Sequence, residues 1–89
     1  MQIFYKKSYK KSFQKLPKPI QEKAVQRIAL FVENPHMDIL NNHALSGELL
    51  WYSSINITGD YRALFEELSE GRYEFVEFVD IGTHSQLYR

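Results

Sequence analysis

The sequence lacks cysteine, long apolar runs and an excess of either charge. Without cysteine, disulfide bonds and thiolate metal sites are excluded, and a reducing cytoplasm is compatible with the chain. No apolar run approaches the roughly 20 residues that a membrane-spanning helix needs, and residues 1–7 contain no apolar core of signal-peptide length. We therefore expect a soluble cytoplasmic protein with no membrane partner, folded as a single domain over residues 1–89.

Glycine and histidine are also scarce. The four glycines are dispersed among turns, so no glycine-rich phosphate loop is present. The three histidines, His36, His43 and His84, do not have the spacing of metal ligands. We expect no metal and no cofactor.

The zero net charge hides an uneven distribution. Residues 1–35 contain eight Lys and Arg against two Glu, a formal charge of +6, and residues 36–89 contain three Arg against nine acidic residues, a formal charge of −6. A basic half suits a polyanion such as RNA or an acidic partner, and it is equally the pattern of a solvated helix surface.

The first half of the chain has helical periodicity after a short strand at residues 2–5. Tyr9, Phe13 and Leu16 have the spacing of one helix face. Pro17 and Pro19 end that helix and begin another, because proline fits a first helical turn and not an interior. In this second helix we expect an apolar stripe, widened by valines, that ends at Asn34-Pro35; its members are Ile20, Ala24, Val25, Ile28, Phe31 and Val32.

The second half has strand periodicity after an irregular stretch at residues 36–48. Strands are predicted at 51–57, 61–68 and 73–81, separated by turns at 58–60 and 69–72. Trp51 and Tyr52 are expected in the core or on the sheet, and the last strand has apolar residues on both faces, as in a central strand covered on both sides. The fold class predicted is α+β in the order β-α-α-β-β-β: an antiparallel sheet of about four strands with an N-terminal helical hairpin packed on it.

Three segments carry a resemblance to a known family. They are residues 43–47 (His-Ala-Leu-Ser-Gly), residues 55–63 (Ile-Asn-Ile-Thr-Gly-Asp-Tyr-Arg-Ala) and residues 79–88 (Val-Asp-Ile-Gly-Thr-His-Ser-Gln-Leu-Tyr). Together with the element order, they resemble the RelE/ParE toxin superfamily, and its YafQ-like members in particular. The similarity follows the element order over the whole chain and is sharp over residues 43–88.

The resemblance implies the toxin of a type II toxin–antitoxin system, a ribosome-dependent and metal-independent mRNA endonuclease that inhibits translation. Its partners would be a cognate antitoxin in a hetero-oligomer, the ribosome and mRNA. By similarity, the catalytic residues would be His84, His43 and Asp60, and the residues that contact RNA or phosphate would be Arg62, Tyr88, Tyr61 and Asn56. In this reaction the RNA 2′-hydroxyl attacks the neighbouring phosphate and displaces the 5′-oxygen.

This chain departs from the family pattern at two places. Asn56 stands where YafQ-like toxins have a second histidine, and Leu50 and Ser53 stand where the family often has cations. These departures keep two other functions open. One is a ParE-like toxin that poisons DNA gyrase without nuclease activity, and the other is an inactive paralogue that only binds an antitoxin.

Apart from the resemblance, the residue types are themselves suited to RNA cleavage, although each of them also has another interpretation. Histidines suit proton transfer near neutral pH, and an arginine suits a phosphate. The other interpretations are a surface or capping role for His84, a loop role for His43, turn chemistry for Asp60 and an ion pair of Arg62 with Glu77. Tyr88 would either pack the tail or position a nucleotide, and His36 is expected to face solvent.

Overall fold

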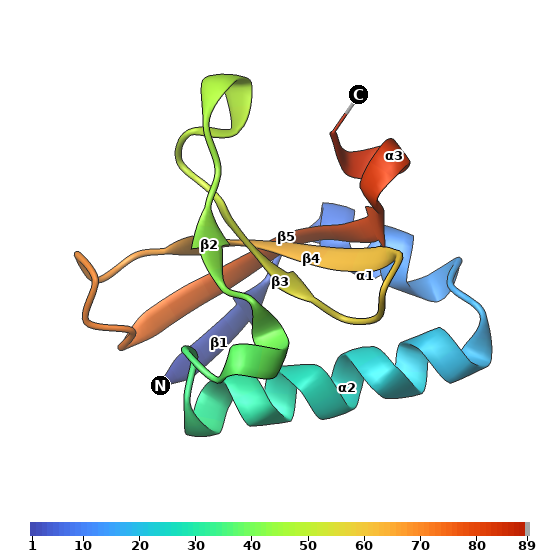
Figure 1. The fold of residues 1–89 in the computed structure, drawn as a ribbon, viewed down its shortest axis with the longest axis horizontal. Coiled ribbons are helices and arrows are strands. Elements are labelled where there is room, and N and C mark those ends of the chain that lie inside the picture. The colour runs from blue at the N-terminus through green and yellow to red at the C-terminus, as the bar shows by residue number, and fades with distance from the viewer. Residues whose placement is uncertain (89) are drawn as a thin grey trace.

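The computed structural model describes residues 1–88, which form two layers, with a long helix lying along one face of a twisted sheet (Figure 1). The elements follow in chain order: β1 Gln2–Tyr5, α1 Lys7–Gln14, α2 Lys18–Glu33, β2 His43–Ala44, β3 Ser53–Asn56, β4 Tyr61–Glu67, β5 Phe75–Thr83 and α3 His84–Leu87. Short 3₁₀ turns at Asp38–Leu40 and Gly47–Leu49 flank β2. No helix among residues 1–88 is long and apolar enough to cross a membrane.

The sheet confirms the α+β class and differs from the prediction in strand number and direction. It has five strands in the order β1-β5-β4-β3-β2. β1 runs parallel to β5, with Ile3 opposite Val76, whereas the other neighbours are antiparallel. The two parallel strands are separated in sequence by both helices and by β2 to β4, so no hairpin fixes their relative direction.

The helices begin and end where the sequence predicts. α1 ends at Gln14, and α2 begins at Lys18 with proline in its first turn. Proline is tolerated there because its missing N–H would have no partner inside the helix. α2 ends before Pro35, and Asn34 is its C-terminal cap in an extended conformation.

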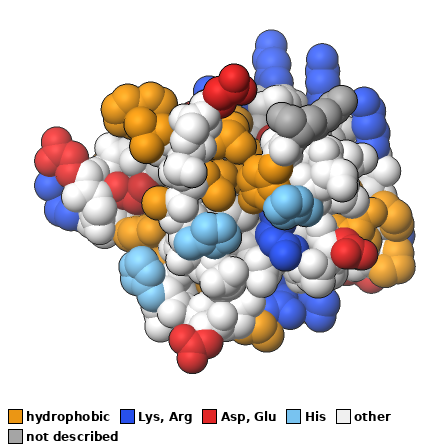
Figure 2. Space-filling model, turned by 45° about the horizontal axis from the view of Figure 1, so that its top comes forward, with side chains coloured by type: hydrophobic (Ala, Val, Ile, Leu, Met, Phe, Trp, Pro, Cys, Tyr) orange, Lys and Arg blue, Asp and Glu red, His pale blue; other side chains and the backbone are white. Residues whose placement is uncertain are grey.

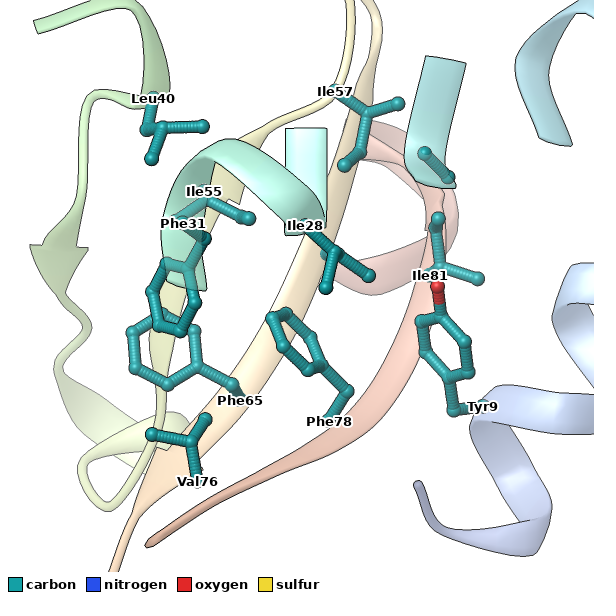
Figure 3. Packing of buried hydrophobic residues seen from close by; sticks show 12 residues of the cluster. Tyr9, Ile28, Phe31, Leu40, Ile55, Ile57, Phe65, Val76, Phe78 and Ile81 are labelled. Carbon is teal, nitrogen blue, oxygen red and sulfur yellow. The ribbon is translucent and has the colours of Figure 1, made fainter. Parts of the chain in front are cut away.

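The core lies between α2, α1 and the inner face of the sheet. Phe31 of α2 contacts Phe65 and Phe78 edge-on, with ring centroids 4.9 and 5.5 Å apart, and all three side chains are fully buried (Figure 3). Such aromatic pairs stabilise a core beyond the area they bury. This cluster fixes the sheet and leaves its other face available.

Two valines that widen the apolar stripe of α2 are exposed, and so is Trp51, which was expected in the core or on the sheet. Val25 and Val32 are 62% and 42% exposed, because each follows a buried residue of the stripe by one position and is therefore rotated about 100° around the helix. Trp51 is 77% exposed, because β3 begins only at Ser53 and Trp51 lies in the turn before it. Tyr52, next to it, is half-buried as expected.

β5 is a central strand, as predicted, between β1 and β4. The apolar residues on both of its faces have a different cause from the one predicted. The register between β4 and β5 shifts at Leu64 and Phe65, which pair with Asp80 and Phe78 and leave Val79 unpaired. A bulge of this kind reverses the alternation of side chains along a strand. The strand is therefore not covered equally on both faces: Val79 is half-buried, and Phe75, on the outer face, is 43% exposed.

Candidate active site

Strand pairing places the candidate residues on the outer face of the sheet, opposite α2. His43 pairs with Ser54, and Asn56 pairs with Arg62. Directly paired residues project to the same side, and the intervening Ile55 projects into the core. The alternation that builds the core therefore also collects polar side chains on the opposite face.

Four of the seven predicted site residues line one hollow of about 290 Å³. They are His43, Arg62, His84 and Tyr88, and Asn41 and Leu45 complete the lining. Figure 2 shows this side of the molecule, where histidine side chains lie among polar and apolar atoms with a basic side chain beside them. These four residues come from β2, β4 and the C-terminal segment that begins with α3.

His43 is held by one ring nitrogen and keeps the other free. Its Nδ1 lies 2.8 Å from the backbone oxygen of Asn41, and the side chain is exposed. A carbonyl oxygen only accepts hydrogen bonds, so Nδ1 carries the proton in this contact. In the neutral ring, Nε2 is then unprotonated and can take a proton from a substrate.

His84 begins α3, directly after β5. Its backbone N–H donates to the carbonyl of Asp60 at 3.1 Å, which ties α3 to the β3–β4 turn. Its ring meets Tyr88 edge-on, with centroids 4.4 Å apart. Thr83 and Gln86 cap the helix reciprocally, so α3 has a defined start despite its four residues.

Gly82 is buried and closely packed where β5 meets α3. A Cβ atom there would lie 2.7 Å from Oε1 of Gln86, the atom that accepts the N–H of Thr83. The glycine thus allows the cap of α3 to lie against the strand. The sequence predicted that Gly82 ends the strand, whereas β5 continues to Thr83.

Arg62 is anchored to the β3–β4 turn. One terminal nitrogen, Nη1, donates to the carbonyls of Thr58, Gly59 and Tyr61 at 2.9, 3.0 and 3.1 Å. The alternative in which Arg62 pairs with Glu77 is wrong, because the only ion pair within residues 1–88 joins Arg72 and Glu74. The guanidinium is therefore fixed by neutral groups and keeps its full charge for an anion.

Tyr88 both packs the tail and lines the hollow. Its hydroxyl donates to Oγ of Ser54 at 2.9 Å, and Ser54 is fully buried. This bond holds the ring against His84, so the two alternatives for Tyr88 are compatible. Because the hydroxyl is engaged with Ser54, the ring is the part of Tyr88 offered to a ligand.

The other three predicted residues lie outside this lining. Asp60 is exposed, and the turn is organised by Thr58, whose Oγ1 accepts the N–H groups of Asp60 and Tyr61 at 3.3 and 3.1 Å. Tyr61 projects to the helix side, into a separate hollow with Leu16 and Pro17. Asn56 is half-buried beside Arg62, and its Oδ1 is buried with no hydrogen-bond partner among residues 1–88.

Sequence reasoning missed the supporting residues Asn41, Ser54 and Thr58. Ser54 carries no motif, and only the pairing of β2 with β3 shows that it lies beside His43. Asn41 has a positive φ of 46°, a conformation in which asparagine is common. The Asn41-Asn42 pair before His43 was the one sequence feature that could have indicated a turn at Asn41. No group of three or more His, Asp or Glu within residues 1–88 is arranged to hold a metal ion.

Comparison with known proteins identifies the fold. No family model matches the sequence, and no curated protein matches it. YafQ from E. coli strain BL21(DE3) matches with a TM-score of 0.81 at 17% identity, over 99% of this chain and 98% of that one. The fold is that of the YafQ and RelE toxins.

Two toxin–antitoxin complexes also contain a matching chain. The E. coli DinJ–YafQ complex gives a TM-score of 0.77 at 20% identity, over 99% of this chain and 97% of the other. The RelBE2 complex from Mycobacterium tuberculosis gives 0.69 at 22% identity, over 91% and 94%. The RelE-like fold expected from the resemblance is thus confirmed, and the function of this chain rests on its own site.

Proposed function

We propose that this chain is the toxin of a type II toxin–antitoxin pair and cleaves mRNA on the ribosome without a metal ion. The observation that carries the proposal is the single hollow lined by His43, Arg62, His84 and Tyr88. It combines two groups able to transfer protons with a fixed cation and an aromatic ring. Cleavage of RNA by its own 2′-hydroxyl needs a base, an acid and a cation for the phosphate.

His43 is the general base and His84 the general acid in this proposal. Nε2 of His43 takes the proton of the 2′-hydroxyl, whose oxygen attacks the adjacent phosphorus. The bond from phosphorus to the 5′-oxygen breaks, and the His84 imidazolium gives its proton to that oxygen. The products are a 2′,3′-cyclic phosphate and a 5′-hydroxyl. Each proton transfer contributes about 10²–10⁴-fold to such reactions.

Arg62 and Tyr88 hold the substrate. The anchored guanidinium stabilises the extra charge of the phosphorane by charge-assisted hydrogen bonds, and the Tyr88 ring packs against a nucleotide. Asp60 acts through its carbonyl, which positions His84, and Asn56 lies beneath Arg62 as a supporting residue. Tyr61 has no direct role here, because it projects to the other face.

The partner that keeps the toxin inactive is a cognate antitoxin. A groove of about 450 Å³ between α1 and α2 has an apolar floor with a basic residue beside it; its lining includes Tyr9, Lys10, Phe13, Val25 and Ile28. An acidic amphipathic segment is complementary to this groove and to the +6 charge of residues 1–35. Association should therefore slow markedly at high salt, and an on-rate independent of salt would contradict the electrostatic part.

Primer extension on mRNA after brief induction of the protein tests the nuclease. We expect new in-frame cleavage ends that disappear with His84→Ala and persist with His36→Ala, a matched exposed histidine outside the hollow. Equal cleavage by the folded His84→Ala protein would contradict the assignment.

A second function, gyrase poisoning as in ParE-like toxins, is favoured by one observation. The turn before β3 is apolar and exposed, with Leu50 and Trp51 at 58% and 77%, where an RNA-binding surface would carry cations. Growth arrest with inhibited DNA supercoiling and no RNA ends would establish this function. An inactive, antitoxin-binding paralogue would give neither arrest nor cleavage.

A further inference from the structure

A second hollow adjoins the candidate active site and shares Leu45 and Tyr88 with it. It has a volume of about 410 Å³ and lies between the Gly47–Leu49 turn and the C-terminal helix α3. Figure 1 shows the two segments rising side by side from the same face of the sheet. A strand of RNA bound at His43 and His84 therefore has a neighbouring compartment within reach.

The lining of this second hollow combines apolar and polar atoms and has one charged residue. Its residues are Leu45, Ser46, Glu48, Leu49, Leu87 and Tyr88. No Lys or Arg among residues 1–88 lines it, so among these residues a phosphate would meet only the negative charge of Glu48. The sugar-phosphate backbone is thus directed to Arg62 in the first hollow, and an uncharged group enters the second. A nucleobase is such a group, with two apolar faces and a polar edge.

Glu48 is free to bind that edge. Its carboxylate forms no hydrogen bond or ion pair within residues 1–88. A carboxylate only accepts hydrogen bonds, so it favours bases that present an amino group: adenine, cytosine and guanine. Uracil presents a carbonyl on each side of its single N–H, and these oxygens repel the carboxylate.

We propose that this hollow is a base-binding subsite that selects an amino-bearing base in the nucleotide next to the cleaved bond. Glu48 determines the specificity by accepting a hydrogen bond from the amino group. Leu45, Leu49 and the Tyr88 ring contact the faces of the base. The proposal rests on the proposed nuclease function, because it assumes RNA in the adjoining hollow.

The turn beside the subsite contains a built-in reporter. Trp51 is the only tryptophan of the chain, and it lies in the same exposed turn as Glu48. We expect a base that stacks on or displaces this turn to change the fluorescence of Trp51, so that binding is measurable without any cleavage. Figure 2 shows apolar side chains together with an acidic side chain along the upper part of this face.

The first experiment titrates the purified protein with 2′-O-methyl dinucleotides, which cannot be cleaved, and follows Trp51 fluorescence. We expect the adenine and cytosine dinucleotides to bind about tenfold more tightly than the uracil dinucleotide, the effect of one charge-assisted hydrogen bond. Glu48→Gln should remove that preference, because an amide both donates and accepts. Glu70→Gln, an exposed glutamate in the β4–β5 turn, is the matched control and should keep it.

The second experiment maps the bases that flank cleavage sites for the parent and Glu48→Gln. Loss of a bias against uracil in the variant supports the subsite. Cleavage with the same flanking bases in both proteins overturns the subsite and leaves the nuclease proposal standing. Absence of cleavage by the parent overturns the nuclease proposal, and the dinucleotide titration still decides whether the hollow selects amino-bearing bases. Equal binding of all dinucleotides by the parent overturns the proposed base-binding subsite.

Discussion

The two faces of the sheet carry side chains with different roles, although the same strands supply both sets. On the inner face of β4, Ala63 and Phe65 are fully buried against the helices. On the outer face, Arg62 lines a polar hollow. One residue along the strand thus separates a side chain that stabilises the fold from one available for chemistry. Substitutions on the two faces should therefore separate stability from activity.

The largest effect is expected on the outer face. His43→Ala should lower the cleavage rate by about 10²–10⁴-fold, because the general base is lost, and should change stability by less than about 0.5 kcal/mol, because the side chain is exposed. Single-turnover cleavage on ribosomes and thermal unfolding measure the two quantities. His36→Ala is the control. If His43→Ala lost enough stability to account for its lost activity, the outer face would not be separable from the inner face in its effect on stability.

The opposite result is expected on the inner face. Phe65→Ala should lower the free energy of unfolding by about 3–5 kcal/mol, because it leaves a cavity between the rings of Phe31 and Phe78. Denaturant unfolding measures this loss. Phe75→Ala, in the same sheet and 43% exposed, should cost far less. Equal losses for the two variants would show that the inner face is not the main source of stability.

The β4–β5 turn contributes to stability outside both faces of the sheet, and we expect this contribution to depend on pH. The Glu67 carboxylate accepts the N–H groups of Ser69, Gly71 and Tyr73 and the hydroxyl of Ser69. Although burial raises its pKa, these hydrogen bonds together lower it below the usual 4.5. A lowered folded-state pKa gives stability that is present above the unfolded-state pKa and is lost as pH falls through the folded-state pKa.

Glu67→Gln should therefore destabilise the protein by about 1 kcal/mol at neutral pH, a modest value because solvent screens this carboxylate. The difference from the parent should shrink in acid, below the usual glutamate pKa. Urea unfolding at several pH values measures it. Glu66→Gln, one position earlier, removes no hydrogen bond of the turn and should show a smaller change. A difference independent of pH would contradict this account.

An effect about as large as that of Glu67→Gln is expected from the hydrogen bond that joins Tyr88 to the sheet. Tyr88→Phe removes the hydroxyl that Ser54 accepts and should cost about 0.5–1.5 kcal/mol. Because the ring remains, cleavage should fall much less than in Tyr88→Ala. A double-mutant cycle with Ser54→Ala isolates the bond. Purely additive losses would show that the hydrogen bond does not hold the ring in place.

The sequence predicted what depends on local pattern. The proline pair placed the start of α2, and the turn residues placed the strands closely. It did not predict the parallel pairing of β1 with β5 or the bulge at Val79, because both depend on contacts between distant segments. The apolar pattern of β5 was identical for a bulged strand and for one covered on both faces.

The candidate site shows the same division. The motif residues His43, Arg62, His84 and Tyr88 were predicted and meet in one hollow. Ser54 was not, because a serine in a strand has no distinguishing local signal. Tyr61 was assigned to the site by the family resemblance, but it projects to the face opposite that of Arg62, because neighbouring strand residues project to opposite faces.

The parallel pairing of β1 with β5 has a consequence for the order of synthesis. β1 leaves the ribosome early, and its partner is completed only when residues 75–83 follow. The helices form from local contacts, whereas the sheet closes only across a long separation in sequence, which slows folding. A chain interrupted before residue 75 has an unpaired first strand and lacks both His84 and Tyr88. Under the proposed nuclease function, the nascent protein therefore cannot cleave the message from which it is being translated before β5 and α3 have been made.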